Sequence, residues 1–153
     1  MTAPKPVSVL CDWKPSGRIS LWRYAGNTRH YPGWHLNADA AGCRSLIDLL
    51  DALATEYGRY RTVPLLPPGA AQLRVPDNRR SACIAATKLQ WMLSDATTLW
   101  RFPPDGDPAV LTVGSDWLAP LRRGLHDIAR GRGDYCIGGD RNGNLPLWFW
   151  WGS

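Results

Sequence analysis

The hydrophobic pattern of the chain changes its period several times. Apolar residues alternate with polar ones in short stretches and recur three or four residues apart in two longer ones. Alternation places successive side chains on opposite faces of a strand, whereas the longer interval lines one face of a helix. The alternating stretches predict strands near 7–13, 18–25, 34–38, 60–66 and 71–75 in the first half, and near 88–93, 97–102, 109–113, 134–138 and 145–151 in the second.

Two helices are predicted, one in each half of the chain. The first runs near 43–57, and its leucines and Tyr57 form one stripe, with Gly58 following as a residue suited to a helix end. The second begins at Ser115 or Asp116, so that Pro120 falls near the first turn, where proline is tolerated. Its inward stripe is Leu118, Leu121, Leu125 and Ile128, while Arg122, Arg123 and Arg130 face water.

A short motif occurs twice and suggests a duplication. The stretch "SLWRY" at 20–24 returns as "TLWRF" at 98–102, and at the same offset Trp13 falls on Trp91. Repeats of this kind indicate recurring structural units. The sequence therefore predicts a single α+β domain over 1–153, an internally duplicated unit of strand-strand-strand-helix-strand-strand in two diverged copies, about 1–77 and 78–153. Its sheet is expected to be mainly antiparallel and to carry the two helices.

The stretch "SACIAATKLQWML" at 81–93 fits two structures. Its alanines and leucines recur at helical spacing, yet its counterpart in the first copy, "VSVLCDW", alternates. The repeat therefore favours a strand over 88–93, and a helix remains the alternative for 82–93. In the two LWR motifs, the aromatic side (Trp22 with Tyr24, Trp100 with Phe102) is expected to face the core. The other side carries Arg23 and Arg101, which are expected to be half-exposed.

The segment "LPLWFWW" at 145–151 is apolar at every position. Leu147, Phe149 and Trp151 fall on one face of the predicted strand, and Trp148 and Trp150 on the other. An apolar residue at every position indicates that both faces are shielded from water. The second face is covered by the chain itself, by another subunit or by a ligand. We therefore take Trp148, Trp150, Arg23 and Arg101 as candidate binding residues.

Composition and charge narrow the class of protein. The chain has 153 residues, nine tryptophans and a net charge of +5, and its longest basic runs are two residues long. The charge is too dispersed to favour nucleic acid, so a weak nucleic-acid binder using Arg23, Arg101 and the Arg122–Arg123 pair is only an alternative. The sequence shows no signal-peptide pattern and no apolar run that could span a bilayer. We expect a cytoplasmic, bacterial-type protein without membrane contact.

Motifs for catalysis or metal binding are weak. The four cysteines lie far apart without a CxxC pair, and "GDRNGN" at 139–144 lacks the glycine and glutamate of a calcium loop. The stretch "GDRNGN" instead predicts a hairpin whose turn lies at Asn142-Gly143. Phosphate-binding and nucleophile-elbow motifs are absent from the sequence, and Glu56 is its single glutamate. We expect no metal and no cofactor.

One group of reactive residue types lies close together in the sequence. It falls between a predicted strand and the start of a predicted helix, and its members are His30, His35, Asp39 and Cys43. A cysteine beside a histidine and an acid is a pattern that nucleophilic catalysis uses. These residues are the candidate catalytic set of an alternative function, a hydrolase or transferase.

The leading hypothesis is a small intracellular protein-binding domain. Immunity-like or regulator-like proteins have this size and lack catalytic motifs. The analogy with them rests only on the length of the chain and on the lack of catalytic motifs in the sequence. The expected partner is another protein or a second copy of the chain. The contact is expected through a sheet face or a sheet edge.

Overall fold

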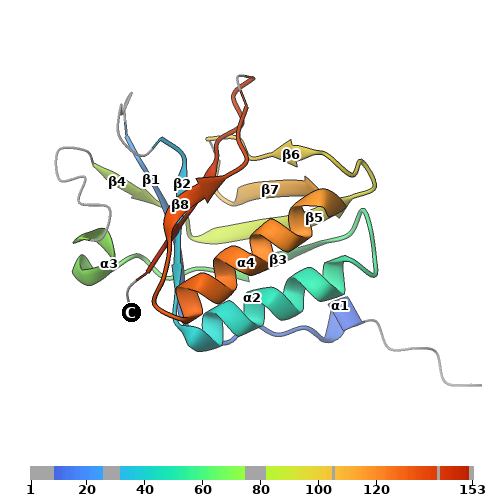
Figure 1. The fold of residues 1–153 in the computed structure, drawn as a ribbon, viewed down its shortest axis with the longest axis horizontal. Helices are drawn as coiled ribbons and strands as arrows, with labels where there is room; N and C mark the ends of the chain where they lie inside the picture. Colours follow the sequence, from blue (N-terminus) through green and yellow to red (C-terminus); the bar gives the residue numbers. More distant parts are fainter. Residues whose placement is uncertain (1–8, 26–31, 75–81, 105, 141, 152–153) are drawn as a thin grey trace, which may run out of the picture.

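The computed structural model describes residues 9–25, 32–74, 82–104, 106–140 and 142–151, and the fold below is that of these residues (Figure 1). It is a mixed α+β structure. The described residues form two sheets and four α-helices, of which α2 and α4 exceed seven residues. The lengths of α2 and α4 agree with the two helices that the sequence predicts.

Sheet A has five strands and sheet B has four. In spatial order, sheet A consists of β4 (Cys83–Ala85), β1 (Ile19–Tyr24), β2 (Trp34–Ala38), β9 (Leu147–Trp150) and β8 (Asp134–Ile137). Sheet B consists of β3 (Tyr60–Pro64), β5 (Lys88–Ser94), β7 (Ala109–Gly114) and β6 (Trp100–Arg101). Each sheet is mixed, because β2 pairs in parallel with β9 and β5 in parallel with β7 while the other pairs are antiparallel. The expectation of one mainly antiparallel sheet is not confirmed.

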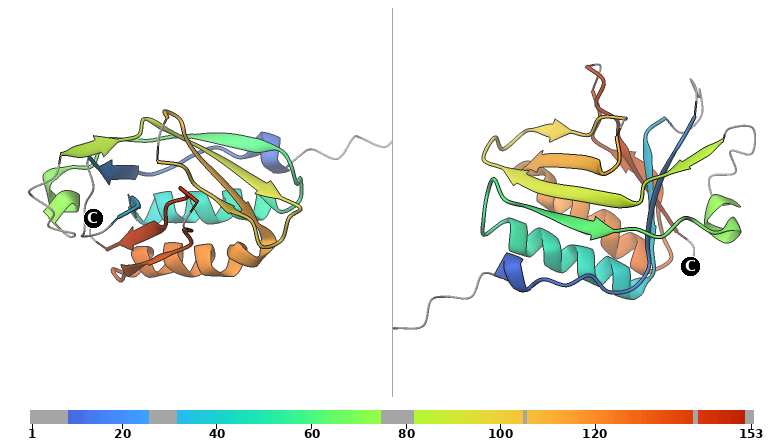
Figure 2. Two further views of the ribbon diagram at one scale, coloured as in Figure 1. Left: turned by 90° about the horizontal axis from the view of Figure 1, so that it is seen from above. Right: turned by 180° about the vertical axis from the view of Figure 1, so that it is seen from behind.

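The two long helices lie side by side on the same side of sheet B. They are α2 (Ala40–Leu53) and α4 (Leu118–Ala129), the latter preceded by the 3₁₀ turn η1 (Ser115–Trp117). Figure 2 shows both helices on one side of sheet B, and in its right-hand view no other described element covers the strands. Sheet A stands across one end of this layer pair, so that its inner face closes the space between sheet B and the helices (Figure 1).

The main core fills this space. Leu46, Leu49, Leu50 and Leu53 of α2 are fully buried there, as the helical stripe predicts. Strand β5 adds Leu89, Trp91 and Leu93, and strand β9 adds Leu147 and Phe149. The helix ends at Leu53 rather than near 57, and the predicted member Tyr57 is 51% exposed.

Residues 88–93 form a strand, and the helical alternative for them is wrong. Strand β5 runs through the centre of sheet B between β3 and β7, where its alternating apolar residues face the core. The preceding β4 was not predicted. It is a three-residue edge strand that pairs with β1, and so short a run carries no clear period.

Two predicted strands are helical over most of their described residues. Residues 9–12 of the first form α1 (Val9–Asp12), and residues 71–74 of the second lie in α3 (Ala70–Arg74). Two alanines and Gln72 favour the helix, and the Gln72 side chain accepts a hydrogen bond from the Gly69 N–H at 2.8 Å, which caps the first turn. Residues 7, 8 and 75 of these predictions lie outside the described part.

The two sheets have related strand pairings. The run β1-β2-β9-β8 contains an antiparallel, a parallel and an antiparallel pair, and so does the run β6-β7-β5-β3. The two LWR motifs nevertheless point in different directions. Trp100 and Phe102 face the main core, whereas Trp22 and Tyr24 point away from it on the other side of sheet A. The internal duplication stays a prediction.

Candidate functional site

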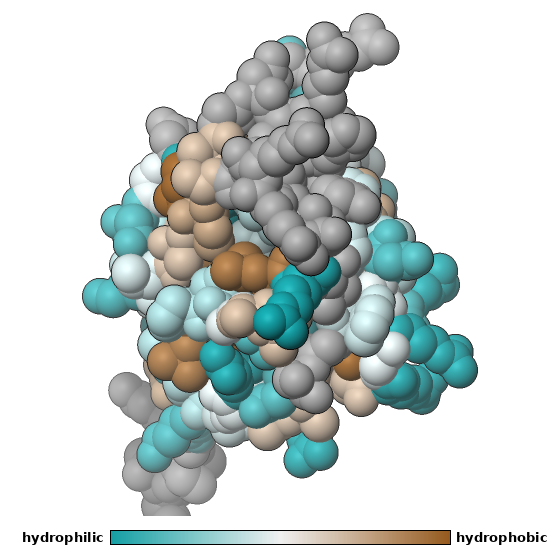
Figure 3. Space-filling view, turned by 90° about the vertical axis from the view of Figure 1, so that its left-hand side faces the viewer, coloured by the Kyte–Doolittle hydropathy of each residue, from teal (hydrophilic) through white to brown (hydrophobic). Residues whose placement is uncertain are grey.

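The outer face of sheet A, which points away from the main core, carries a row of aligned side chains. The row crosses all five strands in register and consists of Ala85, Trp22, His35, Trp148 and Cys136. Trp22, Tyr24 and Trp150 form a second buried cluster on this face, and Leu73 of α3 packs against it. Figure 3 looks onto this side, where the described apolar side chains reach the surface only in small separate patches.

His35 lies at the centre of this second cluster and is fully buried. Its ring is stacked near the rings of Trp22 and Trp150, with centroids 5.7 Å and 6.0 Å away, and it meets the Tyr24 ring edge to face at a centroid distance of 4.9 Å. Trp150 Nε1 donates a hydrogen bond to His35 Nδ1 at 2.8 Å. Because an indole nitrogen only donates, His35 Nδ1 carries no proton, and the neutral ring holds its proton on Nε2.

Several further polar groups are buried on this face. Asn37 Nδ2 donates to the Trp150 carbonyl at 2.9 Å, which ties β2 to β9. Ser20 Oγ and Trp22 Nε1 are buried without a hydrogen-bond partner among the described residues. The cluster thus combines aromatic packing with a neutral imidazole, an arrangement that orients His35 rather than exposing it to a substrate.

The candidate catalytic residues are not brought together. His30 lies outside the described residues. Asp39 is the N-cap of α2, and its Oδ1 accepts hydrogen bonds from Gly42 N at 2.7 Å and Arg18 N at 2.9 Å. Cys43 is fully buried in the main core, on the opposite side of sheet A from His35.

The environment of Cys43 also opposes its use as a nucleophile. Burial, with a smaller effect of the nearby Asp39 charge, raises the pKa of the Cys43 thiol to about 12. The thiolate is the reactive form of cysteine, so Cys43 is almost wholly unreactive at neutral pH. The described members of this set therefore give the hydrolase or transferase alternative no support.

The candidate binding residues occupy three different environments. Trp150 is 4% exposed in the second cluster, whereas Trp148 is half-buried and donates through Nε1 to the Pro32 carbonyl at 2.9 Å. The Arg23 guanidinium lies over the Trp34 ring at 5.9 Å, and Arg101 is exposed on β6. Trp151, which was expected to share the burial of Leu147 and Phe149, follows the end of β9 and is 49% exposed.

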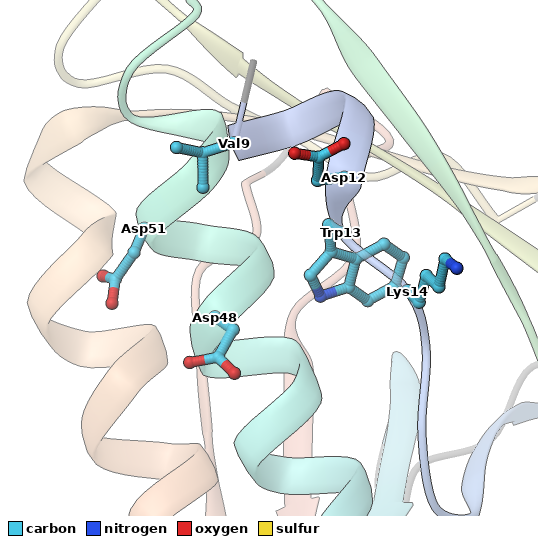
Figure 4. A pocket seen from close by; sticks show the side chains of 6 residues that line it. All are labelled: Val9, Asp12, Trp13, Lys14, Asp48 and Asp51. Carbon is cyan, nitrogen blue, oxygen red and sulfur yellow. The ribbon is translucent and has the colours of Figure 1, made fainter. Parts of the chain in front are cut away.

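A shallow depression of about 510 Å³ lies between α1 and α2 (Figure 4). It is lined by Val9, Asp12, Trp13, Lys14, Asp48 and Asp51. Two of its polar groups have partners within the fold: Trp13 Nε1 donates to the Ser45 carbonyl at 2.8 Å, and Asp51 pairs with Arg122 of α4. These contacts hold α1 and α4 against α2.

The outer face of sheet B was not singled out from the sequence. Tyr60 is in register with Met92, Met92 with Thr112, and Thr112 with Arg101, so one row crosses all four strands. A second row is Thr62, Gln90 and Val110. The alternation in strand β5 that predicts a core position for Leu89, Trp91 and Leu93 places the residues between them on this outer face. They are Lys88, Gln90 and Met92, so the sequence pattern could have identified the face.

Neither a metal site nor a membrane span is found in the described part of the chain. No three histidine, cysteine or acidic residues there are grouped so that they could hold a metal ion. No helix in the same residues is long and apolar enough to cross a bilayer. Comparison with protein-family models, curated proteins and solved structures finds no match for this chain.

Proposed function

We propose that this protein is a protein-binding module that contacts its partner through the outer face of sheet B. The observation that carries the proposal is that α2 and α4 cover only one face of this sheet, and no other described element covers the opposite one (Figure 2). The function belongs to the immunity-like or regulator-like class, in which binding itself is the activity.

The residues on this face support the proposal. Its centre is uncharged, since the parallel pair β5 and β7 contributes the half-buried Gln90, Met92 and Val110 and the buried Thr112. Tyr60, which is 56% exposed, lies at one end of the longer row and the exposed Arg101 at the other. Protein interfaces have few charges at their centre and are enriched in tyrosine, methionine and arginine.

The terminal aromatics give less support to a binding role. Trp150 is already enclosed by His35 and neighbouring rings, and the Trp148 indole nitrogen already has an acceptor in the chain. Using them for a partner would require the second cluster to open. The outer face of sheet B requires no such rearrangement.

Site-specific photo-crosslinking tests the proposal. A photoreactive phenylalanine analogue replaces Thr62, which is exposed on this face, or Ala119, which is exposed on α4 on the helical side. In extract of the source cells we expect a discrete protein adduct from position 62 and none of that mass from position 119. Equal adduct patterns at the two positions, or no adduct at position 62, would refute binding through this face.

A further inference from the structure

We infer that the part of the partner that rests on the outer face of sheet B is acidic. This inference depends on the proposed function, because it names the chemistry of the partner at the same surface. It is carried by the charges that the strands of sheet B contribute and by the position of those charges around an uncharged centre.

The four strands of sheet B contain cations but no acidic residue. Their sequences are YRTVP, KLQWMLS, AVLTVG and WR, in which the charged residues are Arg61, Lys88 and Arg101. Arg61 is engaged elsewhere, because its guanidinium donates to the Trp13 carbonyl at 2.8 Å and lies over the Trp13 ring. Lys88 and Arg101 therefore remain as the charges at the margin of this face.

The two margins differ in how far their charge is neutralised. Near Lys88, Asp107 accepts a hydrogen bond from the Thr87 hydroxyl at 2.7 Å, and its pKa is lowered by Thr87 first and by Lys88 to a smaller extent. Lys88 thus has a carboxylate nearby. No ion pair is formed by Arg101 within the described residues, so its charge stays available to a partner.

Complementary charge favours an acidic partner over a second copy of this chain. Interfaces place opposite charges across from each other, and like charges in contact cost several kcal/mol. If two copies met through this face, the strands of neither copy would supply a carboxylate for Arg101 of the other. A partner with carboxylates around an apolar centre would instead match both the charged margin and the uncharged middle.

The dimensions of the face agree with a small contact. Strands of five, seven, six and two residues, about 4.8 Å apart and with about 3.3 Å per residue, give roughly 300 Å². A stable interface of standard size buries about 800 Å² on each partner. The face therefore accommodates one acidic segment of a partner rather than the flat side of a whole domain.

Charge reversal separates this inference from the proposed function. The photoreactive analogue at position 62 is combined with Arg101→Glu, or with Arg123→Glu as the matched control, since Arg123 is exposed on α4. We expect Arg101→Glu to lower the adduct yield about tenfold or more and Arg123→Glu to leave it unchanged. Thermal unfolding of each variant confirms that the fold is retained.

The crosslinked peptide gives a second, independent readout. Mass spectrometry of the adduct is expected to identify a partner peptide with more aspartate and glutamate than lysine and arginine, and nuclease treatment is expected to leave the adduct intact. An undiminished adduct in Arg101→Glu, a neutral or basic partner peptide, an adduct of two copies of this chain, or loss of the adduct to nuclease would overturn the inference. If the adduct is undiminished in Arg101→Glu or the partner peptide is neutral or basic, the face still binds a protein and the proposed function stands. If no variant gives an adduct, both the inference and the proposed function are refuted.

Discussion

One side-chain hydrogen bond, from Trp150 Nε1 to His35 Nδ1, links strand β9 to the central strand β2 in addition to their backbone pairing. Both side chains are buried, so the bond is made where water does not compete for either group. A buried group that loses its partner keeps the full cost of having left water, about 1–3 kcal/mol. The position of His35 among tryptophans therefore depends on this donor.

Trp150→Phe keeps an aromatic ring but removes the donor. We expect it to lower the free energy of unfolding by about 1–3 kcal/mol, measured by urea denaturation. Trp151→Phe is the matched control, because Trp151 is 49% exposed and its replacement should change stability by less than about 0.5 kcal/mol. Equal effects of the two substitutions would show that the bond to His35 contributes nothing.

Cys43 leads to a prediction about reactivity and pH. At pH 8 a thiol with a pKa of about 12 is ionised to roughly one part in ten thousand, so an alkylating reagent should label the exposed Cys11, Cys83 and Cys136 and spare Cys43. Labelling of Cys43 should appear only in denaturant, which mass spectrometry of peptides detects. Because the folded pKa is raised, the contribution of Cys43 to stability is present below pH 9 and lost as the pH rises towards 12. Rapid labelling of Cys43 in the native protein would contradict this.

At the scale of elements, the close approach of α4 to β9 depends on Gly124. A Cβ atom at this position would overlap the ring of Phe149, which is fully buried. Alanine is normally better than glycine in a helix by about 1 kcal/mol. Overlap with a buried ring costs about 1–3 kcal/mol, and the ring cannot move into solvent.

We therefore expect Gly124→Ala to destabilise the protein despite its better helix propensity. The net of the two effects is a decrease of up to about 2 kcal/mol in the free energy of unfolding. Adding Phe149→Leu makes room beside α4, so the double variant should lose less than the sum of the two single losses in denaturant unfolding. A stabilised Gly124→Ala variant would mean that α4 lies farther from β9 than the structure shows.

Local periodicity predicted the elements whose residues bury one stripe or one face. The leucine stripe of α2 and the alternation in β5 are such cases, because each repeats often enough to define a period. The short helices α1 and α3 were predicted as strands, since four or five residues do not distinguish the two periods. The pairing of β2 with β9 joins segments over a hundred residues apart, and alternation within each strand carries no information about its neighbour.

The site was less accessible to sequence reasoning than the fold. Asp39 was chosen for its possible chemistry, yet the sequence places it directly before a helix, where an aspartate caps the backbone. His35 and Cys43 lie eight residues apart on opposite sides of sheet A, because a strand and the helix after it direct their side chains independently. Arg101 alone of the candidate binding residues lies on the face that we propose for the partner.

At the scale of the whole molecule, each sheet is built from strands of both the first and the second part of the chain. Sheet A takes β4, β1 and β2 from before residue 96 and β9 and β8 from after it, whereas sheet B takes β3 and β5 from before and β7 and β6 from after. Every sheet therefore has an interior pair that joins the two parts. Neither part contains a complete sheet or a complete core.

Cutting the chain between Ala96 and Thr97, in the turn between β5 and β6, tests this interdependence. We expect fragments 1–96 and 97–153 to show no cooperative unfolding alone and to recover the circular dichroism and thermal transition of the intact chain when mixed. In fragment 97–153 each sheet is reduced to two strands, and a two-stranded sheet is marginal in water. Fragment 1–96 keeps β4, β1 and β2 of sheet A but loses β9, β7 and α4, which complete the core. A cooperative transition in either fragment alone would show that it holds a core of its own.

The parallel pairing of β2 with β9 has a consequence for synthesis on the ribosome. Strand β2 ends at Ala38, but its neighbour is not made until residues 147–150. One edge of β2 stays open while residues 39–146 are translated, and unpaired apolar edges promote aggregation. Sheet A thus cannot close until residues 147–150 have been made, and an incomplete chain that lacks β9 presents the quality-control machinery with an unpaired strand edge.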